Sequence, residues 1–326
     1  MTRLWAFIGV LLILGGLTLP VRAERAAPVQ SRLTIYFVTN RQLAGEDELG
    51  PKFGNKQSGT LQFGSASIDV LRHKSSPADI DDYRVREIRT YGSVRDMVQA
   101  MRTSGSPGKA PRRALVLVHG YNEGLTASVR RAAAIVSVGR IEAVPVVFSW
   151  PSANNWRKYH RDLRLSKFSG PAFGQAMSLL NESGAFNSIH VFAHSMGARV
   201  VTAAASSGAL DGRRKIDGLV VASSDISLPN FRGVLPNLTR VARRILIESY
   251  VRDDVLFVSG VRAADAARLG NATQRQMERA KILPHRRVKA IILDDLGVRS
   301  CEGGSHRCSE TSPQALQLLR EFLAGR

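Results

Sequence analysis

A serine near the middle of the chain lies between an apolar run and a stretch of helix-forming residues. Residues 189–200 read IHVFAHSMGARV, and Ser195 has Ala193 two positions before it and Gly197 two positions after it. A strand that turns sharply into a helix needs small residues at these positions, because the two backbones pass close together. The pattern predicts a nucleophile elbow carrying Ser195, although Ala193 replaces the usual first glycine. An ordinary helix N-cap serine is the simpler alternative.

A second apolar run, 115–118, is followed by His119-Gly120-Tyr121-Asn122. Enzymes with a nucleophile elbow take one oxyanion-hole amide from the loop after such a strand and the other from the residue after the nucleophile. We therefore expect the backbone amides of Tyr121 and Met196 to bind an oxyanion. The ring of His119 is expected to brace its own loop by hydrogen bonding.

A serine hydroxyl becomes a nucleophile only when a base takes its proton and an acid orients that base. In enzymes with a nucleophile elbow, the acid and then the histidine follow the serine along the chain. His285 precedes the apolar run 288–293 and so falls at the wrong edge of a parallel sheet, whereas His306 follows that run. We predict His306 as the base. His194, beside the nucleophile, is expected to point elsewhere.

Aspartates follow two of the apolar runs at the edge of the sheet that carries the nucleophile. Asp225 follows the run 217–222, and the pair Asp253-Asp254 follows the run 244–250. The later strand is the commoner donor of the acid, so Asp253 is the predicted acid. Asp254 and Asp225 remain alternatives, and each of the three would also suit a helix cap.

The elements that position these residues alternate from residue 113 onward. Strand-like runs lie at 114–118, 143–148, 188–193, 217–222, 244–250 and 288–293, and helix-like patterns lie at 124–138, 166–182, 197–208, 229–241 and 262–280. A last helix follows Ser312-Pro313, with Ser312 as its N-cap. This alternation predicts a doubly wound, mostly parallel sheet with helices on both faces. Together with the elbow it predicts a single-domain α/β-hydrolase fold, with ligands bound at the carboxyl ends of the strands.

The N-terminal third has a weaker pattern. Residues 33–38 predict one strand, whereas 41–82 are polar and rich in glycine, with a weak strand candidate at 67–71. We assign residues 24–112 to an N-terminal strand and an irregular segment. Residues 113–326 form the predicted α/β-hydrolase core.

Residues 1–23 have the features of a signal peptide. An arginine at position 3 precedes the apolar stretch 5–19, and Val21-Arg22-Ala23 has small residues where signal peptidase cleaves. We expect export to the periplasm or the exterior. A membrane anchor that is not cleaved is the alternative, because residues 4–21 are uncharged and barely long enough to cross a bilayer.

The formal net charge of the 326-residue chain is +19, and losing Arg3 and Arg22 with the signal peptide leaves +17. The arginines are dispersed, which favours non-specific peripheral contact with anionic membrane or envelope polymers. The sequence carries no RNA-binding signature or zinc-finger spacing, so no specific nucleic acid partner is expected. One basic stretch either faces an anionic substrate or forms a solvated helix face. It contains Arg157, Lys158, Arg161, Arg164 and Lys167.

Cys301 and Cys308 are the two cysteines of the chain. In an oxidising compartment they predict a disulfide. A zinc site made of these cysteines and His306 would match no common ligand spacing. The sequence has neither a P-loop nor a dinucleotide-binding glycine motif. We therefore expect no metal and no organic cofactor.

Four segments together resemble a bacterial α/β-hydrolase family known as domain of unknown function 900. They are YFVTNR at 36–41, VHGYN at 118–122, FSWPS at 148–152 and AHSMG at 193–197. The FSWPS segment is the most specific of these. The resemblance extends from about residue 32 to the end of the chain, and it implies an esterase- or lipase-like enzyme.

The resemblance places the family's serine on Ser195, its aspartate on Asp253 and its histidine on His306. The family usually has an aromatic pair soon after the histidine, where this chain has Arg307, Cys308 and Ser309. We hypothesise that a disulfide between the two cysteines replaces aromatic packing in holding the histidine.

These residues predict a serine hydrolase that cleaves a carboxylic ester or related acyl substrate through a Ser-His-Asp triad and an acyl-enzyme. Two alternatives stay open. The first alternative is a catalytically silent module of hydrolase fold that binds anionic envelope polymers or lipid. The second is an acyltransferase. Both remain because the fold alone does not decide the function.

Overall fold

The computed structural model describes residues 28–72, 76–103, 113–212, 216–262 and 267–325. The predicted signal peptide, residues 1–23, lies outside the described residues. Within these ranges, every helix is too short or too polar to span a bilayer.

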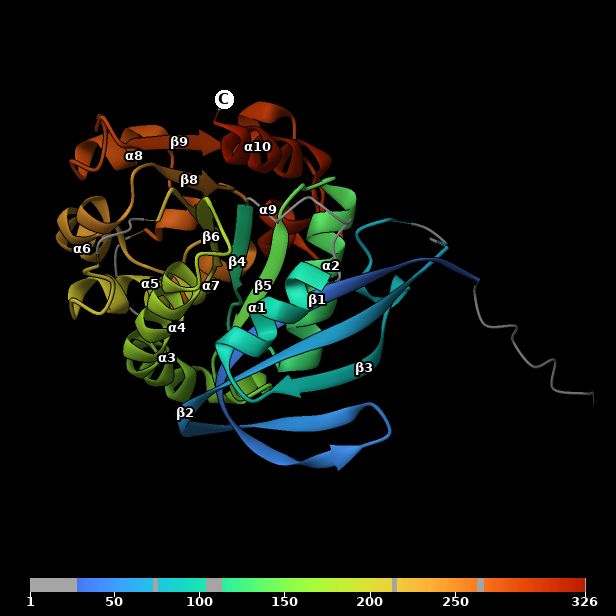
Figure 1. Ribbon diagram of the computed structural model, residues 1–326. Coiled ribbons are helices and arrows are strands. Elements are labelled where there is room, and N and C mark those ends of the chain that lie inside the picture. The colour runs from blue at the N-terminus through green and yellow to red at the C-terminus, as the bar shows by residue number, and fades with distance from the viewer. Residues whose placement is uncertain (1–27, 73–75, 104–112, 213–215, 263–266, 326) are drawn as a thin grey trace, which may run out of the picture.

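A nine-stranded sheet runs through the protein in the order β3-β2-β1-β5-β4-β6-β7-β8-β9 (Figure 1). Its parallel half consists of β4 (Arg113–Val118), β5 (Val144–Ser149), β6 (Ser188–His194), β7 (Gly218–Ala222), β8 (Ile245–Ser249) and β9 (Val288–Ile292). Each of these strands begins and ends within one residue of its predicted bounds. The predicted α/β fold with a mostly parallel sheet is therefore confirmed.

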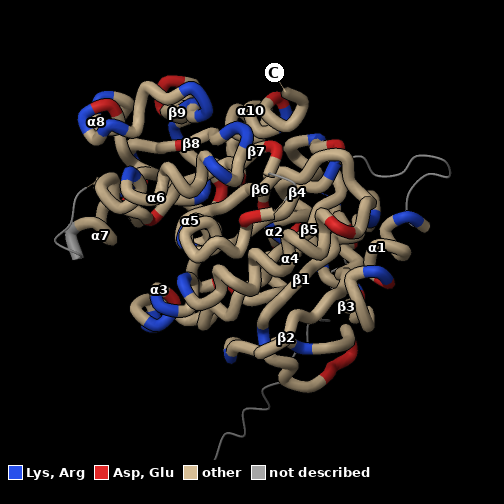
Figure 2. Tube along the Cα trace, turned by 60° about the vertical axis from the view of Figure 1, so that its left-hand side comes forward, with Lys and Arg blue, Asp and Glu red and all other residues tan. Residues whose placement is uncertain are grey.

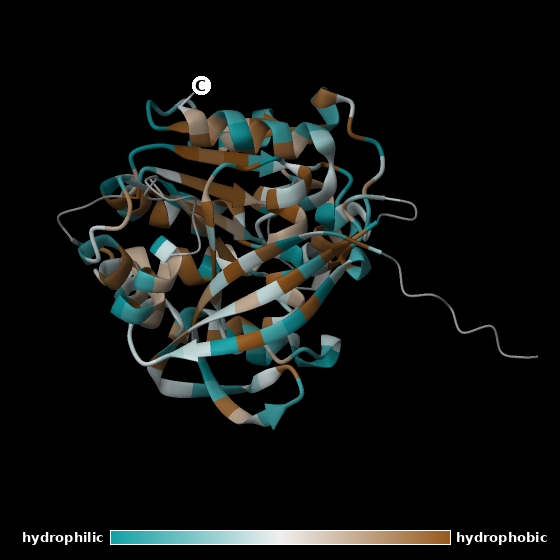
Figure 3. Cartoon of the chain, turned by 45° about the vertical axis from the view of Figure 1, so that its right-hand side comes forward, coloured by the Kyte–Doolittle hydropathy of each residue, from teal (hydrophilic) through white to brown (hydrophobic). Residues whose placement is uncertain are grey.

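Helices cover both faces of the sheet. One face carries α1 (Val94–Thr103), α4 (Gly170–Glu182), α5 (Gly197–Ser206), α6 (Leu228–Val241) and α8 (Gln274–Arg279), and the other carries α2 (Leu125–Val138) and α10 (Pro313–Ala324). Val116 of β4 packs into the first of these layers, whereas Leu115 and Leu117 pack into the second. A strand buried on both sides must be apolar throughout, and the central strands are mostly brown in Figure 3.

Two predicted helices are divided in the structure. The pattern at 166–182 covers the end of α3 (Tyr159–Phe168) and all of α4, and Pro171 in the first turn of α4 explains the break, because proline has no N–H to continue a helix. The pattern at 262–280 covers the end of α7 (Asp254–Arg262), a 3-10 turn at Leu269–Asn271 and α8. Thr273 starts α8 with a capping box.

The C-terminal helix begins as predicted, because the Ser312 side chain accepts a hydrogen bond from the amide of Ala315 at 3.1 Å. The remaining short elements are η1 (Ile80–Asp82), η2 (Trp156–Lys158), η4 (Leu293–Leu296), η5 (Ser305–Arg307) and α9 (Cys308–Thr311).

The predicted strand at 33–38 and the weak candidate at 67–71 both lie in strands, but the prediction that the rest of 41–82 is irregular is wrong for most of its described residues. Strands β1 (Val29–Asp47) and β2 (Gly50–Leu71) form a long antiparallel hairpin, and β3 (Tyr83–Tyr91) pairs with β2. Strand β1 pairs in parallel with β5, so the hairpin extends the core sheet. The glycines of this stretch suggested loops, but Gly64 lies inside β2, where a side chain would collide with the ring of Phe37.

The substitution Gly64→Ala tests this explanation. We expect a loss of about 1–3 kcal/mol in the free energy of unfolding, because the added methyl group must displace the Phe37 ring or the β3 backbone. The matched control is Gly59→Ala in the same strand, where an added Cβ has nothing within 4 Å. Urea unfolding of both variants measures the difference, and equal stability would contradict the packing described for Gly64.

Candidate active site

The predicted elbow forms where β6 ends at His194 and α5 begins at Gly197. Ser195 has a φ of 52°, a left-handed conformation that costs a non-glycine residue about 1–3 kcal/mol. Its amide donates to the carbonyl oxygen of Ala222 in β7 at 2.9 Å. A side chain at Gly197 would collide with the carbonyl oxygen of Val118 in β4. The bend is thus fixed between two neighbouring strands, and the hydroxyl stands at the carboxyl edge of the sheet.

Ser195, His306 and Asp253 form a chain of hydrogen bonds. Nε2 of His306 lies 2.8 Å from Oγ of Ser195, and Nδ1 lies 2.7 Å from Oδ2 of Asp253. The Asp253 side chain is fully buried, and its Oδ1 accepts from the amide of Leu256 at 3.0 Å. A ring protonated on Nδ1 donates to the carboxylate and leaves Nε2 free to accept from the hydroxyl, which is the geometry that activates a serine.

The two alternative acids have other partners. Asp225 accepts hydrogen bonds from the hydroxyls of Tyr159 at 2.6 Å and Ser259 at 2.7 Å. Asp254 is exposed and accepts from the hydroxyl of Ser305 at 3.2 Å. Both ring nitrogens of the histidine are engaged by other groups. The structure therefore places Asp253, the first choice for the acid, against the imidazole of His306, and the carboxylates of Asp225 and Asp254 bind other groups.

The two residues predicted for the oxyanion hole lie beside the nucleophile. Met196 follows Ser195 directly at the N-terminus of α5, where the first N–H groups have no carbonyl partner within the helix. Tyr121 lies in the loop after β4 and lines the same cavity as Ser195. The two loops are in close contact, because a methyl group on Gly120 would lie 3.1 Å from Cβ of Ser195.

His119 braces the loop after β4, as expected. Its ring stacks on Trp150 with the ring centroids 5.3 Å apart. Nδ1 lies 2.8 Å from the carbonyl oxygen of Gly120, and Nε2 lies 3.3 Å from Oγ of Ser149. Burial, assisted by the charge of Arg41, lowers the pKa of His119 to about 4. The ring is therefore neutral at physiological pH and serves as a hydrogen-bonding strut.

Two of the segments that carry the family resemblance meet at Arg41, which is 1% exposed. Its guanidinium donates to Oγ of Ser149 at 2.8 Å and to the carbonyl oxygens of Ser152 at 3.1 Å and Glu123 at 2.7 Å. Burial lowers the pKa of Arg41 to about 9. Sequence reasoning did not assign this residue a role, because the partners of a buried arginine become visible only when distant segments meet.

His194 was expected to point away from the nucleophile, and its ring contacts the segment that carries the predicted base. Its Nε2 lies 3.0 Å from the backbone carbonyl oxygen of His306, and its Nδ1 lies 3.6 Å from Oε1 of Glu310. Burial lowers the pKa of His194 to about 4, so the ring is neutral and donates from Nε2. His194 turns away from the serine hydroxyl and instead supports the backbone of the predicted base.

A buried group of charged residues holds the segment that follows the histidine. Nε of Arg131 lies 2.6 Å from Oε1 of Glu123, and Nη1 of Arg307 lies 2.8 Å from Oε2 of Glu310. Arg307 also lies 3.6 Å from Glu123, which links the two pairs. Burial raises the pKa of Glu123, but Arg131 and Arg307 outweigh this effect and hold it below its usual range. These ion pairs fix the position of Arg307, the residue directly after the predicted base.

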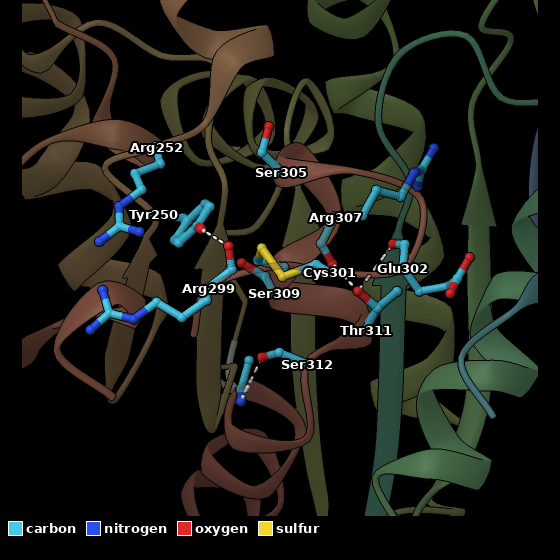
Figure 4. Close-up of a disulfide and its surroundings, with 12 residues drawn as sticks. Tyr250, Arg252, Arg299, Cys301, Glu302, Ser305, Arg307, Ser309, Thr311 and Ser312 are labelled. Atoms are coloured by element: carbon cyan, nitrogen blue, oxygen red, sulfur yellow. Dashed lines mark hydrogen bonds between the residues drawn. A yellow bond between two sulfur atoms is a disulfide. The ribbon is translucent and has the colours of Figure 1, made fainter. Parts of the chain in front are cut away.

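Cys301 and Cys308 form the expected disulfide (Figure 4). The bridge closes the loop that contains His306, and Cys308 is fully buried. The hydroxyl of Thr311 lies within hydrogen-bonding distance of the carbonyl oxygens of Glu302 and Arg307, at 3.2 and 2.9 Å. The loop that delivers the imidazole is therefore tied both covalently and by hydrogen bonds.

Ser195 and His306 open into a cavity of about 1030 Å³ between α3 and α7. Its non-aromatic apolar lining consists of Leu163, Met196, Val255, Leu256 and Val258, and aromatic side chains of η2, α3 and the loop after β4 also line it. The basic stretch predicted at 156–167 falls on η2 and α3, where Figure 2 shows several Lys and Arg positions. Arg157 lines the cavity, Arg161 donates to the carbonyl oxygen of Asn55, and the other three basic side chains are exposed.

A parallel sheet that carries a serine elbow at its carboxyl edge defines the class of the α/β hydrolases. The model of the family described as "Alpha/beta hydrolase of unknown function (DUF900)" matches residues 104–300, and the chain belongs to this family. Ser195 and Asp253 lie inside the matched range, and His306 lies beyond it. Among solved structures, a Pyrobaculum calidifontis esterase in a monoclinic form aligns with 92% of this chain and 86% of its own, at 9% identity and a TM-score of 0.37. No curated protein matches the sequence.

Glu248 is a buried carboxyl that sequence reasoning also missed. It lies on β8 and is fully buried, with the hydroxyl of Ser309 beside it. Burial raises the pKa of Glu248 to about 8, so the folded protein keeps this carboxyl protonated at neutral pH. Its position inside a predicted apolar strand gave no indication of this environment.

Glu248 gives a prediction about stability and pH. The unfolded chain releases this proton near the ordinary pKa of 4.5, whereas the folded chain keeps it up to about 8. The free energy of unfolding should therefore fall across this interval by up to about 1.4 kcal/mol per pH unit. Glu248→Gln removes the titrating group, so its stability relative to wild type should rise from about pH 5 to about pH 8.

Urea unfolding at several pH values measures this difference. Glu182→Gln on the exposed face of α4 is the control, and its stability relative to wild type should not follow this trend. A difference between Glu248→Gln and wild type that stays constant with pH would contradict the raised pKa.

Proposed function

We propose that this protein is a serine hydrolase that cleaves a carboxylic ester or related acyl substrate through an acyl-enzyme. The observation that carries the proposal is the position of the His306 ring, with Nε2 2.8 Å from the Ser195 hydroxyl and Nδ1 2.7 Å from the Asp253 carboxylate. The hydroxyl faces a cavity that is large enough for a small ester and has apolar side chains among its walls. Membership of an α/β-hydrolase family supports hydrolase chemistry in general.

The first half of the reaction forms the acyl-enzyme. Oγ of Ser195 attacks the carbonyl carbon while Nε2 of His306 accepts the hydroxyl proton, and the Asp253 carboxylate stabilises the resulting imidazolium. The amides of Met196 and Tyr121 bind the oxyanion, and the N-terminus of α5 adds a partial positive charge. The tetrahedral intermediate then collapses, and the departing alkoxide takes the proton from the imidazolium.

The second half hydrolyses the acyl-enzyme. A water molecule gives a proton to Nε2 of His306 and attacks the same carbonyl carbon, which forms a second tetrahedral intermediate. Its collapse breaks the bond to Oγ of Ser195, and Ser195 recovers its proton from the imidazolium. The products are a carboxylic acid and an alcohol, and the residues return to their starting state.

We further propose that this chemistry takes place outside the cytoplasm. The disulfide between Cys301 and Cys308 supports an oxidising compartment. Export to the periplasm or the exterior by the sequence-predicted signal peptide at 1–23 would deliver the chain to such a compartment.

The proposed roles of the three side chains are tested by substitution. Ser195→Ala should lower kcat/KM for short 4-nitrophenyl esters by at least about 10³-fold, and Asp253→Asn should lower it by about 10³- to 10⁴-fold, because members of such a triad act as a unit. Asp254→Asn should lower kcat/KM by less than about tenfold, because the Asp254 carboxylate does not orient the imidazole. Activity that survives Ser195→Ala would reject the assignment of the nucleophile. An Asp254→Asn defect as large as that of Asp253→Asn would reject the acid.

The disulfide is predicted to support catalysis through His306. In the double variant Cys301→Ala/Cys308→Ala the loop loses its covalent tie, so we expect kcat for the same esters to fall by about tenfold or more while KM changes little. Intact mass with and without reductant verifies the bridge in the wild-type protein, and thermal unfolding shows whether the variant is folded. Unchanged kcat in a folded variant would show that the ion pairs of Arg307 hold the base without help.

A further inference from the structure

One cationic side chain of the cavity has no part in the chemistry proposed above. Arg199 lies on α5, about one helical turn after the elbow, and lines the cavity that Ser195 faces. The side chain is half-buried, and one Nη donates to the backbone carbonyl oxygen of Asp225. Its Nε is buried, and no hydrogen-bond partner for it exists in the part of the chain that the structure describes.

Among the residues that the structure describes, the charged side chains that line the cavity carry an excess of positive charge. The cationic ones are Arg157, Arg199 and Arg268, and the anionic ones are Asp225 and Asp254. Arg157 and Asp254 are exposed, so solvent and salt screen their charges. The described part of the inner wall then carries two guanidinium groups and one carboxylate.

That one carboxylate is committed to other groups. Oδ2 of Asp225 accepts from the hydroxyl of Tyr159, and Oδ1 accepts from the hydroxyl of Ser259 and lies 3.5 Å from Nε of Arg268. Arg268 is 3% exposed, so this pair is shielded from water. Within the described ranges, the contact of Asp225 with Arg199 is made by its backbone carbonyl oxygen and not by its carboxylate. The charge of Arg199 is therefore left for a group that enters the cavity.

We propose that Arg199 forms an anion subsite and that the preferred substrates are esters with a carboxylate close to the scissile carbonyl. A half-buried guanidinium charge is costly when nothing offsets it, and a carboxylate that accepts from the Nη groups of Arg199 in the cavity reduces this cost. The planar guanidinium fits the two oxygens of a carboxylate, and the low polarity of the walls strengthens the contact. The hemi-esters of short dicarboxylic acids are substrates of this kind. This inference rests on the proposed function, because the anion is recognised beside the same nucleophile.

Pairs of esters that differ only in charge test the subsite. With the anion in the acyl part, ethyl hydrogen glutarate is compared with ethyl glutaramate, its neutral amide. With the anion in the alcohol part, 3-acetoxypropanoate is compared with 3-acetoxypropanamide. We expect wild type to prefer the anionic member of at least one pair by about tenfold or more in kcat/KM, mainly through KM. Equal kcat/KM values within both pairs would overturn the inference.

Substitution of Arg199 should remove the preference. The substitution Arg199→Met should lower kcat/KM for the anionic ester at least about tenfold more than for its amide. Arg199→Lys should retain part of the preference, because the charge remains although the planar guanidinium is lost. Arg320→Met, an exposed arginine on α10, controls for the change in net charge and should keep the full preference. A preference that persists in folded Arg199→Met would place the anion elsewhere and overturn the inference.

Binding without turnover separates this inference from the proposed function. Ser195→Ala cannot form the acyl-enzyme, so calorimetric titration of this variant with glutarate reports on the subsite alone. We expect binding that is lost in Ser195→Ala/Arg199→Met. If glutarate binds in this way but wild type hydrolyses no ester, the proposed hydrolysis fails and the subsite stands. If esters are hydrolysed but glutarate binding does not depend on Arg199, the subsite fails and the hydrolase stands.

Discussion

The close approach of α5 to β4 is the constraint on which the site depends. Gly197 lies so near the carbonyl oxygen of Val118 that no side chain fits there. The chain must therefore bend sharply at Ser195, which adopts a φ of 52° that serine normally avoids. The hydrogen bond that the Ser195 amide donates to the carbonyl oxygen of Ala222 in β7 helps to offset this cost. The same bend puts the hydroxyl at the rim of the sheet and the following amide at the start of a helix.

The imidazole that meets this hydroxyl comes from the far end of the chain, so its loop needs restraints of its own. The Cys301–Cys308 bridge closes that loop, and the Asp253 carboxylate fixes one edge of the His306 ring. His194 bonds the backbone of His306, and Arg307 is held by two buried glutamates. These restraints reduce the freedom of the ring before any substrate binds, which is how a preorganised site gains rate. The elbow and the loop that carries His306 are thus fixed to each other in part by His194 and Arg307, whose hydrogen bonds and ion pairs among the described residues do not include Oγ of Ser195 or Nε2 of His306.

Much of the fold, and the side chains gathered at the site, could be predicted from the sequence because short local patterns of residues indicate both. Apolar runs bounded by helical patterns give the parallel strands to within one residue. The position of each histidine before or after the last of these runs separates His306 from His285. The hairpin of β1 and β2 could not be predicted, because glycines mark loops in most sequences and here permit close packing. The hydrogen bonds of Arg41 and the ion pair between Glu123 and Arg307 could not be predicted, because the partner groups are far apart in the chain. Arg199 was not assigned a role because its place in the cavity wall, and its bond to a backbone carbonyl rather than to a described carboxylate, appear only in the folded chain.

Reaction with a fluorophosphonate tests the central claim most directly, because this reagent phosphonylates a serine only when a neighbouring base activates the hydroxyl. We expect one label on each molecule of the mature chain, on the peptide that contains Ser195. The folded variant His306→Ala should take up the label at least about 100-fold more slowly. Absence of labelling in the native protein, labelling on another serine, or an undiminished rate in His306→Ala would contradict an activated Ser195 paired with His306.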